Sequence, residues 1–289
     1  MKDLFATVSD EHDGMGIKAF LGSVLGLSAT LIKRVKYGGV FINEENVHMR
    51  AIVKKNDTVR VTLPSSKDSE IEPVDLPLKI IFEDDFLLSV SKPSGMPTHP
   101  SRGNRLPTLA NAVAAYLGRD FVFRAVNRLD KGTSGMVLIA KDPHTSSLLG
   151  KMMKSHAFGK KYEAVLIGVP SPERGLIDAP IEREHPDTIR RCVRQDGKPA
   201  LTEYRTLRVL DNGCSLVEFT LHTGRTHQIR VHASHIGHPL LGDAMYGGGE
   251  GDFALHCKEM TLTHPRTGEP LVLTDKRDLT LSFTLGDKN

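Results

Sequence analysis

The chain has 289 residues, of which 39% are hydrophobic and 25% charged, and its formal net charge is +3. This composition supports a sizeable core in one large domain or two unequal ones, and the mild positive charge permits an acidic partner without requiring it. The three widely spaced cysteines form no Cys-x-x-Cys pair and no apolar run approaches roughly 20 residues, which excludes disulfide scaffolds, cysteine zinc sites and membrane-spanning proteins.

The first expected unit is a small N-terminal α/β domain over residues 14–63, preceded by an extension of residues 1–13. Apolar residues recur at helical spacing in its first half, and Ser28 is predicted to cap the second of two helices. In chain order we expect helices over 17–25 and 28–35, ended by Gly38-Gly39, and short strands over 40–42 and 59–63.

A polar stretch separates this unit from the rest of the chain. Residues 64–73 include the small, aperiodic run from Pro64 to Glu70 and are predicted to be a linker, which leaves 74–289 as a second domain. Strand candidates outnumber helices there at hairpin-like spacing, which favours an α+β fold with a mixed, mainly antiparallel sheet and flanking helices over a doubly wound parallel sheet. Strands are expected at 79–82, 87–90, 136–140, 163–167, 201–210, 216–221 and 254–263, and helices at 108–116, 143–155 and 226–235.

Basic residues are concentrated in the small unit. Between residues 28 and 60, seven bases face three acids, and a basic helix followed by a short sheet is a suitable contact for a phosphate backbone. A solvated helix face would carry the same charges, so charge alone leaves both interpretations open. The bases that we expect to contact RNA are Lys33, Arg34, Lys36 and Arg60.

The residue pattern of this unit is more specific than its charge. It comprises Phe20-Leu21, Leu27-Ser28, Ile32-Lys33, Gly39–Asn43 and Asn56–Val59. The pattern resembles the small RNA-binding domain named after ribosomal protein S-four, although Lys18 and Ala19 stand where an Arg-Leu-Asp opening is common. This resemblance implies a salt-sensitive electrostatic anchor for RNA, not a reader of bases.

The most informative segment of the second domain is Asn127–Gly135, which places Asp130 between Arg128 and a turn-forming Gly-Thr-Ser-Gly run. The apolar run 136–140 follows at once. A carboxylate held on a tight turn beside a buried strand is a candidate nucleophile or general base. By itself, however, an aspartate in such a position is more often a cap or turn former.

Three further segments accompany the Asp130 segment, namely Ser91–Pro100, Lys160–Val165 and Thr223–His232. Together the four resemble the RluA family of RNA pseudouridine synthases, and the match extends from about residue 79 to residue 282. The specific features are the core Arg-Leu-Asp-x-x-Thr-Ser-Gly and the run Gly-Arg-Thr-His-Gln-Ile-Arg. An N-terminal S-four-type domain is a common companion in that family. Asn127 departs from the pattern, because histidine is frequent there.

The resemblance implies a role for each site residue. Asp130 matches the essential aspartate, and Tyr162 matches the tyrosine that packs on the target base and is itself a candidate base. Arg230 matches the arginine that pairs with the catalytic carboxylate, and Arg128 matches a residue that fills the gap left by an extruded base. Arg225, expected to enter the helix over 226–235 with Arg230, is a further candidate RNA contact.

The implied reaction breaks the carbon–nitrogen glycosidic bond of a uridine, turns the uracil and rejoins it through ring carbon five. Because the base is never released, no cofactor or metal is expected. An ionised Asp130 would attack the anomeric carbon or start elimination from the sugar, and a bidentate pair with Arg230 would orient it. Extrusion of the base costs a few kcal/mol, and stacking on Tyr162 recovers about 1–3 kcal/mol. The histidines at 222, 227, 232, 235 and 238 lack a His-Glu-x-x-His arrangement, so they are not expected to bind zinc.

Two other function classes compete with this interpretation. A non-catalytic RNA-binding or ribosome-assembly factor on the same scaffold should have lost one of Asp130, Tyr162 and Arg230, and all three are present. A hydrolytic glycosidase would need a second carboxylate, and the nearest candidate, Asp243, is predicted to be a turn former. We therefore expect a cytoplasmic, monomeric enzyme that modifies structured RNA. Large-subunit ribosomal RNA is its first candidate substrate, and transfer RNA is the second.

Overall fold

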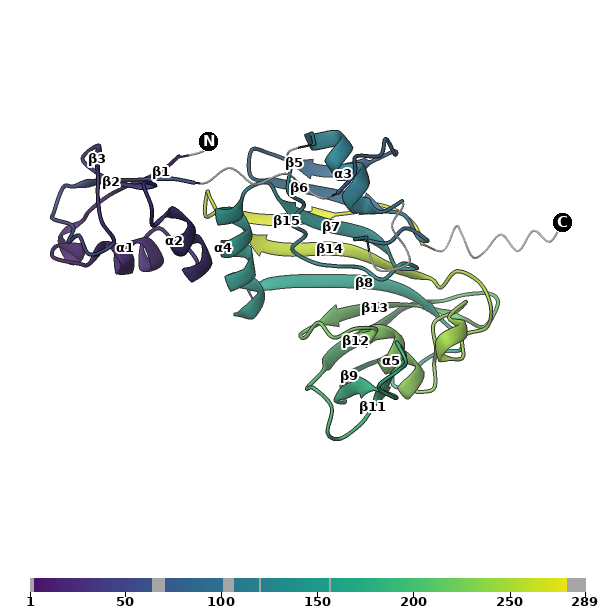
Figure 1. Cartoon of the computed structure of the whole chain (residues 1–289). Helices are drawn as coiled ribbons and strands as arrows, with labels where there is room; N and C mark the ends of the chain where they lie inside the picture. Colours follow the sequence, from purple (N-terminus) through teal and green to yellow (C-terminus); the bar gives the residue numbers. More distant parts are fainter. Residues whose placement is uncertain (1–2, 64–70, 101–106, 120, 156, 280–289) are drawn as a thin grey trace.

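The computed structural model of the chain describes residues 3–63, 71–100, 107–119, 121–155 and 157–279. They form a small N-terminal unit and a larger unit built on a nine-stranded sheet, and helix α4 (Pro143–Lys154) lies on the side of the larger unit that faces the smaller one (Figure 1). None of the described helices is long and apolar enough to cross a membrane.

The N-terminal unit is a four-stranded antiparallel sheet with two short helices packed against it. The expected helix cap is confirmed, because the Ser28 hydroxyl accepts a hydrogen bond of 3.2 Å from the backbone N–H of Leu31. In sheet order the strands are β1 (Asp3–Thr7), β4 (Thr58–Thr62), β2 (Val40–Ile42) and β3 (Glu45–Asn46). The two helices packed against the sheet are α1 (Ile17–Ser23) and α2 (Ala29–Val35), and the 3-10 helix η1 (Asp10–His12) lies between β1 and α1 in the chain.

Strand β1 corrects the predicted boundary at residue 14. It pairs with the whole of β4, and Leu4 is buried in the same core as the helices. The sequence hides this strand because its apolar residues Leu4, Phe5 and Ala6 are consecutive, while Phe5 is 59% exposed, so no alternation marks the edge. The unit therefore includes Asp3–Thr7. The predicted linker falls largely on residues 64–70, which lie outside the described residues.

The larger unit contains a mixed sheet in which every described strand pair is antiparallel except β7 with β14. This confirms the expected mixed, mainly antiparallel sheet. The strand order is β5 (Lys79–Glu83), β6 (Leu87–Lys92), β7 (Ser134–Ala140), β14 (Leu255–Thr263), β8 (Phe158–Leu166), β13 (Ser215–Leu221), β12 (Leu201–Val209) and β9 (Arg174–Asp178), with β15 (Pro270–Thr274) paired to β14 and a separate hairpin of β10 (Ile181–Arg183) and β11 (Arg191–Val193).

The strands that the sequence did not predict are short or polar. Strands β9 and β15 lie at edges of the sheet, and only one residue of each is fully buried. Apolar alternation is the signal that marks a half-buried strand, and edge strands such as these carry little of it. The central strand β7 is the opposite case, because all seven of its residues are buried and its apolar run is continuous.

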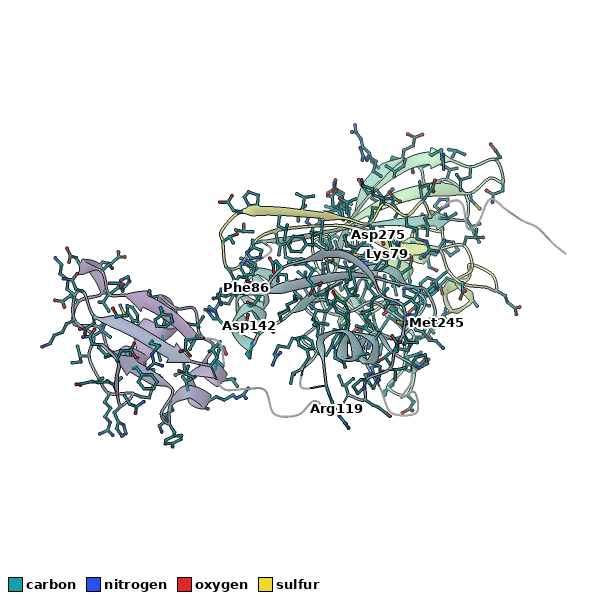
Figure 2. The ribbon with its side chains drawn as sticks, turned by 90° about the horizontal axis from the view of Figure 1, so that it is seen from above. Lys79, Phe86, Arg119, Asp142, Met245 and Asp275 are labelled. Carbon is teal, nitrogen blue, oxygen red and sulfur yellow. The ribbon has the colours of Figure 1, made fainter. Side chains whose placement is uncertain are left out.

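The flanking helices begin at recognisable caps. Helix α3 (Leu109–Leu117) starts with a capping box between Thr108 and Asn111, and Asp142 caps α4 by accepting hydrogen bonds from the backbone N–H groups of His144 and Thr145. Helix α5 (Gln228–His235) begins two residues later than expected, and the 3-10 helix η2 (Ala244–Tyr246) follows it. At the far edge of the sheet Lys79 contacts Asp275 at 2.8 Å (Figure 2).

Helix α4 provides the contact between the two units. The His144 ring nitrogen Nε2 bonds the carbonyl oxygen of Leu25, and Lys151 donates to the carbonyl of Gly26 at 3.1 Å. Gly26 has a φ of +67°, and a Cβ atom there would lie 2.8 Å from a methyl group of Leu148. A side chain at Gly26 is therefore opposed both by the backbone conformation and by the helix that it faces.

Candidate active site

Asp130 lies on the turn that leads into β7, and the surrounding residues fix this turn. Its carbonyl accepts the N–H of Thr133 at 3.1 Å, and Thr98 holds the neighbouring Leu129 through both backbone groups. Gly135 has a φ of +105°, and a Cβ there would stand 2.4 Å from the carbonyl oxygen of Cys257. The glycine thus lets β7 approach β14 closely and brings the Asp130 turn to the central strands of the sheet.

Hydrogen bonds from the segment Ser91–Pro100 also hold this turn in place. Lys92 is fully buried, and its ammonium donates to the carbonyl oxygens of Pro93, Met96 and Lys131 at 2.9, 2.7 and 3.2 Å. Ser94 adds a hydrogen bond of 2.8 Å to the carbonyl of Gly132. Burial lowers the pKa of Lys92 to about 8, so it remains mainly protonated at neutral pH. This part of the sequence pattern therefore positions the Asp130 turn.

Arg230 of α5 has a different main partner from the predicted one. Its Nε and one terminal nitrogen donate to the two carboxylate oxygens of Asp243 at 2.7 and 2.8 Å, whereas its other terminal nitrogen is 3.7 Å from Asp130. The prediction of a bidentate pair with Asp130 is wrong. Asp243 does make a turn, since its carbonyl accepts the N–H of Tyr246, but its buried side chain also anchors the arginine.

The rings of Tyr246 and Phe253 complete the surroundings of Arg230. Their centroids lie 4.8 and 4.4 Å from the guanidinium carbon. Burial lowers the pKa of Arg230, but the hydrogen bonds to Asp243 and the charges of Asp243 and Asp130 together raise it above its ordinary value. A permanent positive charge is therefore fixed beside Asp130 without a close hydrogen bond to it.

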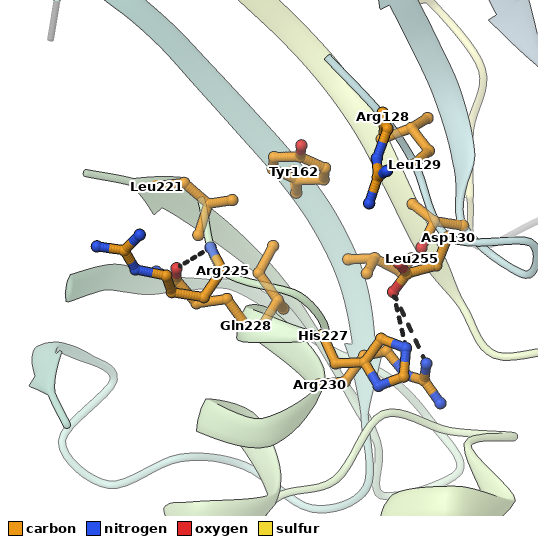
Figure 3. A pocket seen from close by; sticks show the side chains of 12 residues that line it. Arg128, Leu129, Asp130, Tyr162, Leu221, Arg225, His227, Gln228, Arg230 and Leu255 are labelled. Carbon is orange, nitrogen blue, oxygen red and sulfur yellow. Dashed lines mark hydrogen bonds and ion pairs between the residues drawn. The ribbon is translucent and has the colours of Figure 1, made fainter. Parts of the chain in front are cut away.

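His227 is a site residue that the sequence interpretation missed. Its Nε2 is 3.7 Å from the Asp130 carboxylate, and its Nδ1 is 2.8 Å from the Tyr246 hydroxyl. Figure 3 shows His227 and Arg230 directed at the same carboxylate from α5. Burial lowers the pKa of His227, which keeps the ring neutral at neutral pH. Its φ of 59° is unusual for a residue other than glycine, and such strained positions are frequent at functional sites.

Tyr162 of β8 forms another wall of the same pocket. It stands opposite Phe219 and Cys257 in the neighbouring strands and is 6% exposed. Burial raises the pKa of the Tyr162 phenol well above its ordinary value, so the hydroxyl is neutral at neutral pH. The neutral ring offers a packing surface at the wall of the pocket.

These residues enclose a narrow cavity of about 70 Å³, which continues into a wider one of about 450 Å³. Among the described lining residues, Asp130 is the single acid of both cavities. The residues common to both are Arg128, Leu129, Asp130, Tyr162, Leu221 and Arg225. The Asp130 carboxylate, which is 32% exposed, is therefore the acidic group of the described pocket lining, and the arginines of that lining are Arg128, Arg225 and Arg230.

The candidate RNA contacts fall into three groups. Arg128 and Arg225 line the cavity, although Arg225 precedes α5 instead of entering it, and its Nε donates to the carbonyl of Pro199 at 2.9 Å. The bases of α2 and its end (Lys33, Arg34 and Lys36) are exposed on the N-terminal unit. Arg60 is engaged otherwise, with Glu44 at 2.8 Å, Asp3 at 3.5 Å and its guanidinium over Phe41, so its charge is already balanced.

The described part of the chain contains no cluster of three or more histidine, cysteine, aspartate or glutamate side chains suited to a metal ion. His232, one of the five histidines near the site, instead bonds the Thr202 hydroxyl and the carbonyl of Ala179 at 2.8 and 2.9 Å. Its ring is fully buried, and burial lowers its pKa. This histidine joins α5 to β12.

Comparison with known proteins identifies the family. Residues 87–235 match the family described as RNA pseudouridylate synthase. The chain is 35% identical to ribosomal large subunit pseudouridine synthase D of Zymomonas mobilis, over 91% of this chain and 90% of the relative, and 35% identical to an RNA pseudouridine synthase of Bacillus subtilis, YhcT, over 92% and 90%. The solved structure of human RNA pseudouridylate synthase domain containing 1 matches with a TM-score of 0.59 and 26% identity, covering 70% of this chain and 84% of that one. The chain belongs to the RluA-type family of RNA pseudouridine synthases.

Proposed function

We propose that this enzyme converts specific uridines of large-subunit ribosomal RNA to pseudouridine, with Asp130 as the carboxylate that acts on an extruded uridine. The observation that carries the proposal is the setting of Asp130. It is the single acid among the described residues that line the pocket, and Arg230 and His227 approach it to 3.7 Å without a hydrogen bond. A carboxylate in that setting is sterically accessible to a substrate.

The pairing of Arg230 with Asp243 supports this role. A bidentate bond to Asp130 would engage both carboxylate oxygens and reduce their reactivity. With Arg230 held by Asp243, a positive charge stands near Asp130 and leaves its oxygens available. The carboxylate either attacks the anomeric carbon or removes a sugar proton to start elimination, and in both cases the uracil leaves with the electrons of the broken bond. Carbon five then bonds to the anomeric carbon, as the carboxylate is displaced in the first route or as the sugar proton returns in the second. Carbon five finally loses its proton and the freed ring nitrogen gains one, so the atoms of the uridine are conserved.

Tyr162 and Arg128 would handle the extruded base. The neutral, buried Tyr162 ring offers a flat surface at the cavity wall, and stacking on an aromatic ring contributes about 1–3 kcal/mol per base. Arg128 is exposed at the entrance, where its planar guanidinium can take the place of the base in the RNA stack. Both contacts offset part of the cost of extrusion, which is a few kcal/mol.

A hydrolytic glycosidase would need a second carboxylate, and the described lining of the pocket contains Asp130 as its single acid. Such enzymes use two acids that flank the scissile bond, separated by about 5–9.5 Å. Asp243 is 1% exposed and both of its carboxylate oxygens accept hydrogen bonds from Arg230, so it faces an arginine instead of a substrate. Isomerisation within the chain needs one carboxylate only, which matches the lining of the pocket.

The N-terminal unit is proposed to anchor the RNA as an S-four-type domain. Lys33, Arg34 and Lys36 lie on its exposed surface, and the unit contacts α4 of the catalytic unit through Leu25 and Gly26. Replacing the three bases by glutamine should weaken RNA binding. The slope of the logarithm of the binding constant against the logarithm of the salt concentration should become shallower by about 0.7–0.9 for each lost phosphate contact. An unchanged slope would remove the anchor role.

Asp130→Asn is the decisive test of the catalytic assignment. We expect loss of pseudouridine formation in large-subunit ribosomal RNA, with RNA affinity within a few-fold of the wild-type enzyme. Mapping pseudouridines in cellular RNA with and without the gene would identify the modified positions. Turnover by the Asp130→Asn enzyme would contradict the catalytic role of this carboxylate. Modification confined to another RNA would contradict the proposed large-subunit ribosomal RNA substrate.

A further inference from the structure

Lys160 is a largely buried lysine whose ammonium has no hydrogen-bond or ion-pair partner among the described residues and reaches the space of the wider cavity. It lies on β8 two residues before Tyr162, its side chain points to the same face of the strand, and it is 9% exposed. Among the described residues no hydrogen-bond acceptor or acid lies within bonding distance of its ammonium. A Cβ on Gly224 would be 3.7 Å from that ammonium, which places it over the turn before α5 and in the wall of the wider cavity.

Its surroundings offer no compensating charge. The thiol of Cys257 interacts with Lys160, but burial raises the pKa of this thiol to about 12, so it is neutral at neutral pH. Burial also lowers the pKa of Lys160. Burying an ammonium group is strongly unfavourable unless it is paired and hydrogen-bonded. The described residues therefore leave the Lys160 ammonium directed into the wider cavity, where it is available to a partner that arrives with the substrate.

Two other lysines show what is unusual here. Lys92 is also buried, but three carbonyl oxygens accept its protons. Lys161, the next residue on β8, points to the opposite face, is 42% exposed and pairs with Glu259 at 3.2 Å. Both of these lysines are satisfied within the chain, and Lys160 is not.

The wider cavity indicates what kind of group would satisfy Lys160. Its other charged walls are Arg128, Lys131 and Arg225, against Asp130 as the single described acid. This excess of positive charge selects an anion, and in RNA the anions are phosphodiesters. Lys160 and Tyr162 are two residues apart on β8, a separation of roughly 6.6 Å along the strand. The sugar–phosphate backbone of a uridine stacked on Tyr162 would therefore lie close to Lys160.

We propose that Lys160 binds a phosphate of the RNA chain adjacent to the target uridine, in the wider cavity beside the catalytic pocket. The inference rests on the proposed RNA substrate and adds a specific binding site to it. Lys160 then acts as a positioning residue, because its ion pair fixes the backbone on one side of the uridine whose base contacts Tyr162. The phosphate supplies the ion-pair partner that the described residues do not provide.

The test compares uridine with uridine 3′,5′-bisphosphate as ligands of the full-length protein, by calorimetry or NMR titration. In the wild-type enzyme and in Lys161→Met we expect the bisphosphate to bind about tenfold or more tightly than uridine, as a charge-assisted hydrogen bond allows. In Lys160→Met this advantage should fall to about twofold, and Lys160→Arg should keep part of it.

Three results would overturn the phosphate site. One is a bisphosphate that binds wild-type enzyme no better than uridine, and another is an advantage that survives in Lys160→Met. The third is equal weakening of uridine and bisphosphate in Lys160→Met, which would mean that the lysine contacts the base. Methionine fills the same volume without charge, so the thermal midpoint of Lys160→Met should equal or exceed that of the wild type. None of these measurements depends on turnover, so they stand apart from the Asp130 test.

Discussion

Two aspartates of the same sheet unit show how differently a carboxylate can be held. Asp275, directly after β15, is fully buried and contacts Lys79 at 2.8 Å, the Ser91 hydroxyl, and His256 at 3.4 Å. Asp130 is 32% exposed, and its nearest ion-pairing neighbours, the Arg230 guanidinium and the neutral His227 ring, stand at 3.7 Å. Burial raises the pKa of Asp275, but its hydrogen bonds to Lys79 and Ser91 and the nearby His256 ring outweigh this and leave the pKa far below its ordinary value.

The difference separates a structural carboxylate from one that stays available to a substrate, as the proposed role of Asp130 requires. Each oxygen of Asp275 has partners from other parts of the fold, which joins β5, β6 and β14 to the segment after β15. Asp130 has a fixed backbone and a positive setting, but its oxygens remain free for a substrate. A saturated set of hydrogen bonds stabilises the fold, and an incomplete one leaves a group able to react.

The largest expected effect on stability is that of Asp275→Asn. Asparagine keeps the shape but removes the charge that Lys79 faces and weakens the contacts with Lys79 and Ser91. Because Lys79 is 58% exposed and solvent screens this pair, we expect a loss of about 2 kcal/mol. Chemical unfolding monitored by circular dichroism should show this loss, while turnover per folded molecule is retained. A change below about 1 kcal/mol would mean that the Asp275 cluster does not stabilise the fold.

The next effect concerns Asp243, the partner of Arg230. In Asp243→Asn the side chain loses its charge and keeps one acceptor oxygen, so Arg230 loses its bidentate pair and is free to move the remaining distance to Asp130. Because such displacement can cost about a hundredfold in rate, we expect kcat of Asp243→Asn to fall by about that factor. Asp252→Asn, which changes an exposed acid nearby, is the matched control. Equal rates for the two variants would show that Arg230 needs no anchor.

The sequence could predict Asp130 but not the manner in which it is held. The residues around Asp130 form a local pattern, as does the run that contains Arg230, and local patterns can be read without a structure. The partner of Arg230 depended on where the chain after α5 returns, and Asp243 looked like a turn residue because it is one. Nothing in the sequence showed that the same residue also binds the arginine.

The same limit explains His227 and the fold errors. His227 lies inside the pattern Gly-Arg-Thr-His-Gln-Ile-Arg, but its contact with Asp130 results from a left-handed backbone conformation that the sequence does not reveal. Strand β1 was missed because its partner β4 is more than fifty residues away. The sheet class, by contrast, followed from local apolar runs at hairpin spacing, and the structure confirmed it.

A smaller effect should appear in the pH dependence of stability. The lowered pKa of Asp275 adds stability above its unfolded-state pKa, about 3.9, and this contribution is lost as the pH falls towards the folded-state value. The difference in unfolding free energy between the wild type and Asp275→Asn should therefore shrink by about 1 kcal/mol between pH 5 and pH 3. A difference that stays constant over this range would show that the charge of Asp275 is not the stabilising feature.

The smallest effect separates the two aspartates most sharply. Asp130→Asn should change the free energy of unfolding at pH 7 by no more than about 0.5 kcal/mol, because the side chain is partly solvated and has no close partner. Arg230 keeps its bonds to Asp243 in this variant, so no buried charge is left unpaired. A loss above about 1.5 kcal/mol in the unfolding titration would make Asp130 a second structural carboxylate. If the variant is instead fully stable and inactive, the loss of turnover comes from the missing charge and not from a damaged fold.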